Sequence, residues 1–191
     1  MKLMTTGNMK LPKSTLNFSL PPVTTCPGST AKCRKYCYAR KAFRQYPSVR
    51  TAWNRNFEET KKDSFVETIS TQIKNSRTVE TVRIHASGDF YTEAYFRKWL
   101  DIAASFPALT FYAYTKVTTV GAIKRPANFI LLLSDDDNNY QSIWDQFTGV
   151  ATVTLHGDQP EPNFFVCPGK CGACKACYNK TKNKRITFLE H

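Results

Sequence analysis

Seven cysteines are the residues of this chain best suited to chemistry, and they occur in two tight groups. The groups are Cys26, Cys33 and Cys37, then Cys167, Cys171, Cys174 and Cys177. Thiolates spaced two or three residues apart are typical of ligands that converge on one inorganic centre. Close neighbours make poor disulfide partners, because the loops they close are too short, and an odd total argues against complete pairing. The pattern predicts a metal–sulfur protein with all seven cysteines as candidate ligands.

The C-terminal group, at residues 167–177, is similar to the ligand loop of a ferredoxin. Glycine and alanine stand between its cysteines, and small residues allow backbone amides to turn toward sulfur atoms. We interpret this run as a [4Fe–4S] site. Two alternatives remain open: a single structural zinc ion held by four thiolates, and a set of free reactive thiols.

The N-terminal group offers three thiolates. Three cysteines that hold a four-iron cube leave one iron open to an exchangeable ligand. Three and four cysteines suit two clusters, but ligands from both segments could equally meet in one cluster and leave cysteines to spare. A shared cluster would draw the two ends of the chain together, and the metal would then also be structural.

Charge is distributed unevenly along the 191 residues. The chain has a net charge of +12, and both cysteine-bearing segments are basic: +11 over residues 1–77 and +5 over residues 167–191, against −4 between them. Cations near an anionic cluster stabilise it and tune its potential. The alternatives are a solvated basic surface and attraction for the phosphates of nucleic acid.

Aromatic residues alternate with lysine and arginine over residues 32–46, which suits a nucleic-acid partner. Four aromatic rings are available there for stacking on bases: Tyr36, Tyr38, Phe43 and Tyr46. The same rings also suit the core-facing side of a helix.

Length favours one domain, residues 1–188. We divide it into a cysteine-rich opening segment (1–46), a βα core (47–160) and a cysteine-rich C-terminal segment (161–188); residues 189–191 resemble the start of an affinity tag. The sequence has no apolar run of about 20 residues and no secretory signal at its start. We therefore expect a protein of a reducing cytoplasm without a membrane partner.

The elements that position these residues alternate between helix and strand. We expect a helix over residues 31–46 that carries Cys33 and Cys37 on one face, and a long helix over 51–76. A third helix is expected between Thr92, its N-cap, and Pro107, and a short one near 140–147. The expected strands cover residues 81–86, 109–114, 129–133 and 150–155. This alternation predicts parallel βαβ units in a partial, open (β/α) barrel of about five or six strands.

Polar residues follow each expected strand, at positions 85–89, 114–116, 134–137 and 156–158. The carboxyl ends of parallel strands lie at one edge, where active sites of such barrels are built. Asp89, Lys116 and His85 are therefore candidate catalytic residues. Aspartate, serine and glycine are also the ordinary residues of short turns, so each segment retains a purely structural reading.

Four segments of the sequence, in this order, resemble those of a known family. They are Cys26-Pro27 through Cys33-x3-Cys37-Tyr38-Ala39, residues 84–90, residues 111–116 and the C-terminal cysteine run. Together they resemble the phage gene product 88 family, which is distantly similar to the radical S-adenosylmethionine (radical SAM) superfamily. The resemblance implies a phage-encoded iron–sulfur protein with a radical-SAM-like barrel in the host cytoplasm. It also makes S-adenosylmethionine a candidate cofactor.

The resemblance implies roles for particular positions. Ser87, Gly88 and Asp89 stand where the superfamily binds the methionine amine. The superfamily motif is Cys-x3-Cys-x2-Cys, but Arg40 stands where its third cysteine would be, so Cys26 is the candidate substitute.

Three functions compete. The first is a radical-SAM-like oxidoreductase or transferase, which needs one or two [4Fe–4S] clusters and an electron donor. The second is an iron–sulfur protein without catalysis. The third is a nucleic-acid-binding protein stapled by zinc or by a cluster.

Overall fold

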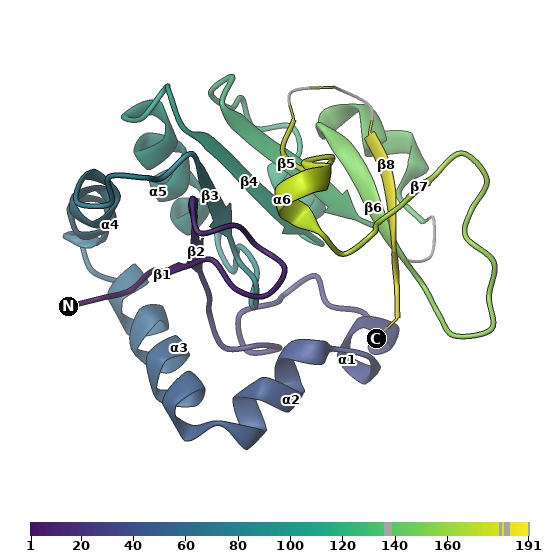
Figure 1. Cartoon of the computed structure of the whole chain (residues 1–191), viewed down its shortest axis with the longest axis horizontal. Coiled ribbons are helices and arrows are strands. Elements are labelled where there is room, and N and C mark those ends of the chain that lie inside the picture. The colour runs from purple at the N-terminus through teal and green to yellow at the C-terminus, as the bar shows by residue number, and fades with distance from the viewer. Residues whose placement is uncertain (136–138, 180, 182–183, 191) are drawn as a thin grey trace.

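The computed structural model describes residues 1–135, 139–179, 181 and 184–190. Within them the chain forms one open, eight-stranded sheet in the order β1-β2-β3-β4-β5-β6-β8-β7 (Figure 1). The first two strands, β1 and β2, are antiparallel, and every other neighbouring pair is parallel. The strands are β1 (Thr5–Thr6), β2 (Thr15–Phe18), β3 (Thr81–Ile84), β4 (Thr110–Thr115), β5 (Phe129–Ser134), β6 (Gly149–Thr154), β7 (Phe165–Val166) and β8 (Lys184–Leu189).

The helices lie mostly in the first half of the chain. They are α1 (Ala31–Lys35), α2 (Tyr38–Gln45), α3 (Pro47–Thr60), α4 (Phe65–Lys74), α5 (Glu93–Ala104) and α6 (Cys171–Cys174), with 3-10 helices η1 (Thr118–Val120) and η2 (Gln141–Gln146). None of the described helices is long and apolar enough to span a membrane.

The two faces of the sheet are covered differently. Strands β2 to β6 are parallel and follow one another in chain order, and connections of the usual right-handed sense then bring the intervening helices to one face. Phe65 of α4 and Trp99 of α5 pack there against Phe18 of β2. We call this the helical face. We call the other the inner face: it carries Tyr112, Ile130, Leu132 and Ile186 and is covered by Cys167, Ala176, Cys177 and Tyr178 of the C-terminal segment.

The mixed α/β class and the open, mostly parallel sheet are confirmed, and the four expected strands correspond to β3, β4, β5 and β6. The expected count of five or six strands is too low. The additional strands β1, β2, β7 and β8 lie within the cysteine-rich segments, where proline, glycine and polar residues obscure a strand pattern. The radical-SAM-like form of the barrel stays a prediction.

Two helix predictions are wrong in their boundaries. Residues 51–76 form two helices because the chain leaves α3 after Thr60 and starts α4 at Phe65. Pro47 begins α3, since a proline at the first helical position lacks only an N–H that has no partner there. The helix expected over residues 31–46 is interrupted before Tyr38, where Cys37 is the N-cap of α2. Thr92 caps α5 as expected, and its hydroxyl accepts a hydrogen bond from the Tyr95 amide.

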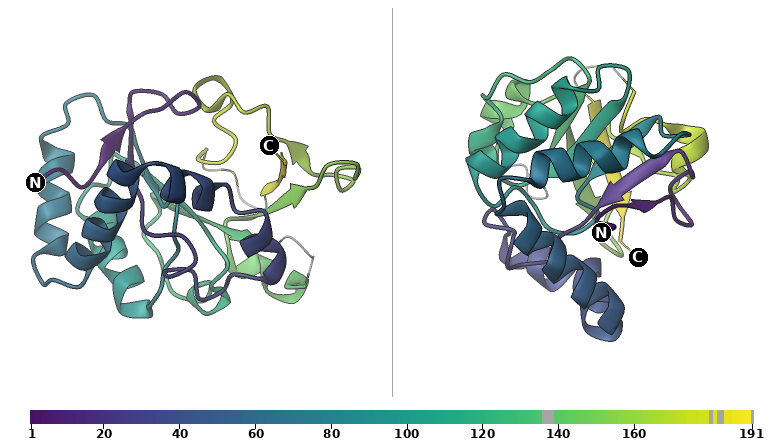
Figure 2. Two further views of the ribbon diagram at one scale, coloured as in Figure 1. Left: turned by 90° about the horizontal axis from the view of Figure 1, so that it is seen from below. Right: turned by 90° about the vertical axis from the view of Figure 1, so that its left-hand side faces the viewer.

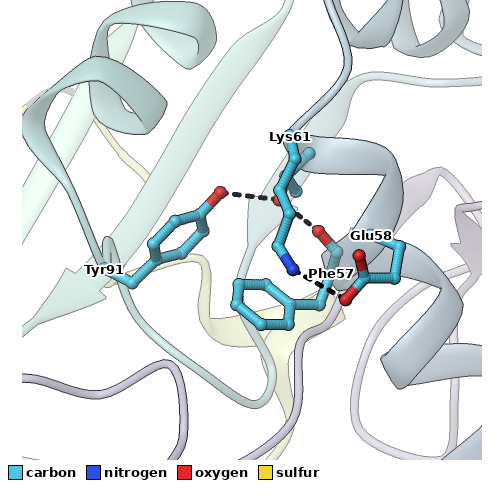
Figure 3. A network of polar contacts seen from close by, with 5 residues as sticks. Phe57, Glu58, Lys61 and Tyr91 are labelled. Carbon is cyan, nitrogen blue, oxygen red and sulfur yellow. Dashed lines mark hydrogen bonds and ion pairs between the residues drawn. The ribbon is translucent and has the colours of Figure 1, made fainter.

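A small network holds α3 near α5 (Figure 3). The hydroxyls of Thr60 and Tyr91 are 2.8 Å apart, and Thr60 donates to the Phe57 carbonyl. The ring of Phe57 packs edge-on against Tyr91 and lies 4.2 Å from the Lys61 ammonium, which also pairs with Glu58. These contacts anchor the C-terminal end of α3 to the body of the protein.

The chain beyond residue 188 is part of the sheet. Leu189 pairs with Thr154, and the Glu190 amide donates to the Thr154 carbonyl. The Glu190 carboxylate in turn accepts a hydrogen bond from the His156 amide. The domain boundary predicted at residue 188 therefore cuts through a paired strand, whereas His191 lies outside the described residues.

Candidate metal centres and the carboxyl edge of the sheet

The N-terminal cysteines lie in the long connection that leaves β2. Thr30 caps α1 and accepts a hydrogen bond from the Cys33 amide, while Cys37 starts α2. All three thiols are half-buried. Burial raises the pKa of Cys26 to about 12, and the nearby Asp89, Cys33 and Cys37 add to the rise. The three cysteines thus form one electrostatic neighbourhood at the carboxyl edge of the sheet.

This cysteine loop is docked tightly on the turns that follow β3 and β4. A Cβ atom at Gly28 would lie 2.3 Å from the carbonyl oxygen of Lys116, so only glycine fits this approach. The Asp89 amide donates to the carbonyl of Thr25. Gly88 has φ +88°, and a Cβ there would meet the Leu20 and Thr25 side chains at 2.6 and 2.7 Å. The position of Cys26 is therefore set by backbone contacts with these turns.

Asp89 and Lys116 meet at this edge. The Asp89 carboxylate accepts hydrogen bonds from the Thr115 hydroxyl at 2.6 Å and from the backbone amides of Phe90 and Lys116. Burial raises the pKa of Asp89, and these hydrogen bonds oppose the rise. The Lys116 ammonium donates to the backbone oxygen and the hydroxyl of Ser134. The structure brings three of the four predicted polar strand ends together.

His85 lies on the helical face, away from the cysteines. Its ring packs against Phe90 at 4.7 Å, and its Nε2 is 2.9 Å from the Tyr95 hydroxyl. Burial lowers the pKa of His85 to about 3, so the imidazole is neutral at physiological pH. His85 also has φ +68°, a strained conformation for a residue with a Cβ. This environment is that of a core residue and does not fit a catalytic base.

Ser87, Gly88 and Asp89 form the turn beneath the Cys26 loop. The Ser87 hydroxyl is buried and has no partner among the described residues, while the Asp89 carboxylate is engaged by three internal donors. Gly88 has no room for a ligand on its Cβ side. The set therefore does not fit recognition of a methionine amine, and the structural role is the better description.

The residues that follow Ser134 and those that follow β6 form turns. The Asp135 carboxylate accepts hydrogen bonds from the Asn139 and Tyr140 amides and from the Trp144 indole. The next two aspartates, at 136 and 137, lie outside the described residues. His156 and Asp158 are exposed in the turn after β6.

The four C-terminal cysteines line one small cavity of about 10 Å³, with Lys170, Lys175, Ala176 and Tyr178. The Gly169 amide donates to the sulfur of Cys167 at 3.4 Å, with Gly169 at φ +71°. In this contact a backbone amide turns toward a cysteine sulfur, as expected for the small residues between the cysteines. The Tyr178 hydroxyl donates to the carbonyl of Cys171, and the Cys171 amide donates to that of Lys10. In Figure 1, α6 lies in front of β4 and β5.

Arg83 of β3 reaches this group from the inner face. Its Nε is buried without a hydrogen-bond partner among the described residues, and its guanidinium is 5.8 Å from the Tyr114 ring. Burial acts to lower the pKa of Arg83, but the phenols of Tyr38, Tyr112 and Tyr114 and the thiol of Cys171 outweigh it and raise the pKa. Sequence reasoning overlooked this residue. The sequence does contain a sign of it. Side chains alternate between the two faces of a strand, so Arg83 points to the face opposite its buried neighbours Val82 and Ile84.

The cysteines are not arranged as a ready ligand set. In the part of the chain that the structure describes, no three His, Cys, Asp or Glu side chains form a metal-binding group. None of the seven cysteines, all of which the structure describes, forms a disulfide, and burial raises the pKa of Cys177 to about 11. Burial also raises the pKa of Cys26 and Cys171, and a thiol with a raised pKa is a poor nucleophile, which disfavours these three cysteines as free reactive thiols.

The sequence of this chain is similar to those of known phage proteins. The family model described as gene product 88 matches residues 2–166. The chain belongs to the gene product 88 family. It is 25% identical to the Gene 88 protein of Mycobacterium phage L5 and 27% identical to that of phage D29. Each alignment covers 83% of this chain and 80% of the phage protein. No solved structure matches. The family match ends one residue before Cys167.

Proposed function

We propose that this member of the gene product 88 family is an iron–sulfur protein with two separate metal centres. The four C-terminal cysteines hold one centre against the inner face. The three N-terminal cysteines hold the other at the carboxyl edge. The observation that carries the proposal is that all four C-terminal cysteines line one small cavity on the inner face, the face from which Arg83 approaches with its Nε buried and without a hydrogen-bond partner among the described residues.

Charge is the first support for the C-terminal centre. With neutral thiols, the half-buried Arg83, whose Nε is buried, has only phenols and a thiol among the groups that raise its pKa, and a buried charge without an anionic partner is costly. Four thiolates around a metal supply a net negative charge. Arg83 then stabilises the deprotonated ligands. The thiols must turn toward the cavity and release their protons when metal binds.

Local contacts support two centres rather than a shared one. The thiol groups that raise the pKa of Cys26 are Cys33 and Cys37, while those that raise the pKa of Cys177 are Cys167 and Cys171. The cysteines of each group therefore interact electrostatically with cysteines of the same group.

The N-terminal centre has the more open surroundings. Three thiols leave one coordination position for an external ligand, and the Asp89 and Lys116 backbones hold the Cys26 loop in place. When bound there, a [4Fe–4S] cluster would supply one-electron chemistry, for which an external electron donor is required. We assign no step to S-adenosylmethionine, because Ser87, Gly88 and Asp89 do not fit its recognition.

Metal analysis of protein purified without oxygen tests the proposal. We expect about eight irons and about eight sulfides per chain after anaerobic reconstitution, and an electron paramagnetic resonance signal on reduction with dithionite. Stoichiometric zinc with no iron, retained after reconstitution, would overturn the redox assignment and leave a zinc-stapled fold. Zinc at the four-cysteine site alone remains the main alternative, because four thiolates also suit zinc.

A further inference from the structure

The arm formed by α1 and α2 has an unusual charge distribution. The first acidic residue of the whole chain is Glu58, and eleven lysines and arginines precede it. Six of these lie between residues 31 and 45. In Figures 1 and 2 the helices α2 and α3 extend away from the sheet, so this surface is not shared with the core. A concentrated basic surface of this kind attracts polyanions.

The cations of α2 share one side of the helix. At 100° per residue, Arg40, Lys41 and Arg44 cover a continuous arc, and all three are exposed. The opposite side carries the buried Ala39 and the half-buried Phe43, whose ring stacks on Trp53 of α3 at 6.0 Å. This packing fixes the orientation of α2 and leaves its basic side facing solvent.

Exposed tyrosines accompany the cations. Tyr38 is 67% exposed, Tyr46 56% and Tyr36 40%. The Tyr38 hydroxyl donates to the carbonyl of Ala86, so its ring is held in place at the carboxyl edge while remaining accessible. The competing expectation was that these aromatics are core residues. Phe43 is half-buried and packs between helices α2 and α3, whereas the three tyrosines are at the surface. A fixed, exposed ring among cations is a stacking platform for unpaired bases.

We propose that the arm formed by α1 and α2 binds single-stranded nucleic acid. Arg40, Lys41 and Arg44 contact the phosphates, and Tyr38 stacks on a base. Stacking requires unpaired bases, which is why a single strand is the partner and a duplex is not. None of these contacts uses a metal, although Cys33 and Cys37 of the proposed N-terminal centre lie in the same arm.

Fluorescence anisotropy with a labelled 20-nucleotide single strand tests the phosphate contacts. The variant Arg40→Gln/Lys41→Gln/Arg44→Gln is compared with Lys74→Gln/Arg77→Gln/Lys124→Gln, which removes the same charge from exposed positions outside the arm. We expect the arm variant to bind at least tenfold more weakly than the control variant. Its slope of log affinity against log salt should be smaller by about two, since each lost phosphate contact removes about 0.7. Equal binding by the two variants would overturn the proposal.

Tyr38→Ala and Tyr38→Phe test the stacking. We expect Tyr38→Ala to lose about fivefold or more in affinity for the single strand, and Tyr38→Phe, which keeps the ring, to retain binding. A duplex of the same length should bind more weakly than the single strand. Binding of anionic lipid vesicles but of neither oligonucleotide would contradict the proposal, as would equal losses in the two tyrosine variants. Circular dichroism confirms that each variant is folded, and metal content is measured separately.

Discussion

The two cysteine groups of this protein occupy different environments. The N-terminal group lies at the carboxyl edge of the sheet, next to polar strand ends, within the part of the chain that matches the gene product 88 family. The C-terminal group packs on the inner face over tyrosine and aliphatic side chains, directly after the family match ends. Three thiols at an edge suit a centre that reacts with an external ligand. Four thiols over a core suit a centre that is complete and structural.

The largest difference between the groups should appear in stability. Cys177→Ser removes a ligand of the proposed centre within the segment that covers the inner face, whereas Cys26→Ser affects an edge loop. We expect Cys177→Ser to reduce the free energy of unfolding by several kcal/mol in metal-loaded protein, since binding energy at a structural site is folding energy. Urea denaturation of both variants measures this. A greater loss for Cys26→Ser would reverse the comparison.

The docking of the N-terminal loop can be tested at Gly88. Gly88→Ala places a Cβ 2.6 Å from the Leu20 side chain at a positive φ, so we expect a loss of about 3 kcal/mol in the free energy of unfolding. Gly157→Ala is the matched control. Gly157 likewise has a positive φ, +92°, but nothing lies within 4 Å of the position that its Cβ would take. We expect this control to lose about 1 kcal/mol from backbone strain alone. Equal losses would mean that the contact with Leu20 and Thr25 is loose.

Protonation of His85 in the unfolded chain should make the stability of the protein fall with pH. The ordinary pKa of histidine is 6.5, and burial lowers that of His85 to about 3, so the unfolded chain binds a proton more readily between these values. The contribution of neutral, buried His85 to the free energy of unfolding is complete above about pH 6.5 and is lost as the pH falls toward 3. From pH 7 to pH 5 we expect a loss of about 2 kcal/mol.

Urea denaturation of His85→Asn at the same two pH values provides the control. Asparagine tolerates the positive φ at this position, and it does not titrate in this range. We expect this variant to lose less stability between pH 7 and pH 5 than the unsubstituted protein. An unchanged pH dependence would show that His85 is not the titrating group.

The smallest expected effect concerns Arg83. Arg83→Gln removes the buried cation beside Cys171, so the reduced, more negative form of a cluster there becomes less stable. We expect its reduction potential to fall by an amount equivalent to about 1 kcal/mol, or roughly 40 mV for one electron. Potentiometric titration measures the shift. The same change at Arg34, an exposed cation of the N-terminal segment, should leave the potential of the C-terminal centre unchanged.

Much of the sheet was predictable because its strands are apolar and separated by clear helices. Residues 129–133 are buried on both faces and read plainly as a strand. By contrast, β2 and β8 alternate polar and apolar residues within segments rich in turn formers. Their pairing depends on contacts with β3 and β6, which are distant in sequence.

The sequence also indicated the two cysteine groups, from their spacing, and the location of Asp89 and Lys116 at one edge of the sheet, from strand direction, but it did not indicate the hydrogen bond between them. It did not indicate that His85 faces the helices. A positive φ at His85 ends the alternation of β3 and turns the ring into the helical face, a backbone change that spacing does not reveal. The role of Arg83 was equally hidden, because it depends on which segment covers the inner face.

Iron content of the two single-cysteine variants tests the central claim most directly. After anaerobic reconstitution, Cys26→Ser and Cys177→Ser are each compared with the unsubstituted protein. Two independent centres predict that each variant loses about half of the iron, about four of eight atoms per chain, and keeps the reduced-state signal of the other centre. Complete loss of iron in either variant would show one shared cluster, and zinc in place of iron in all three proteins would contradict the iron–sulfur account.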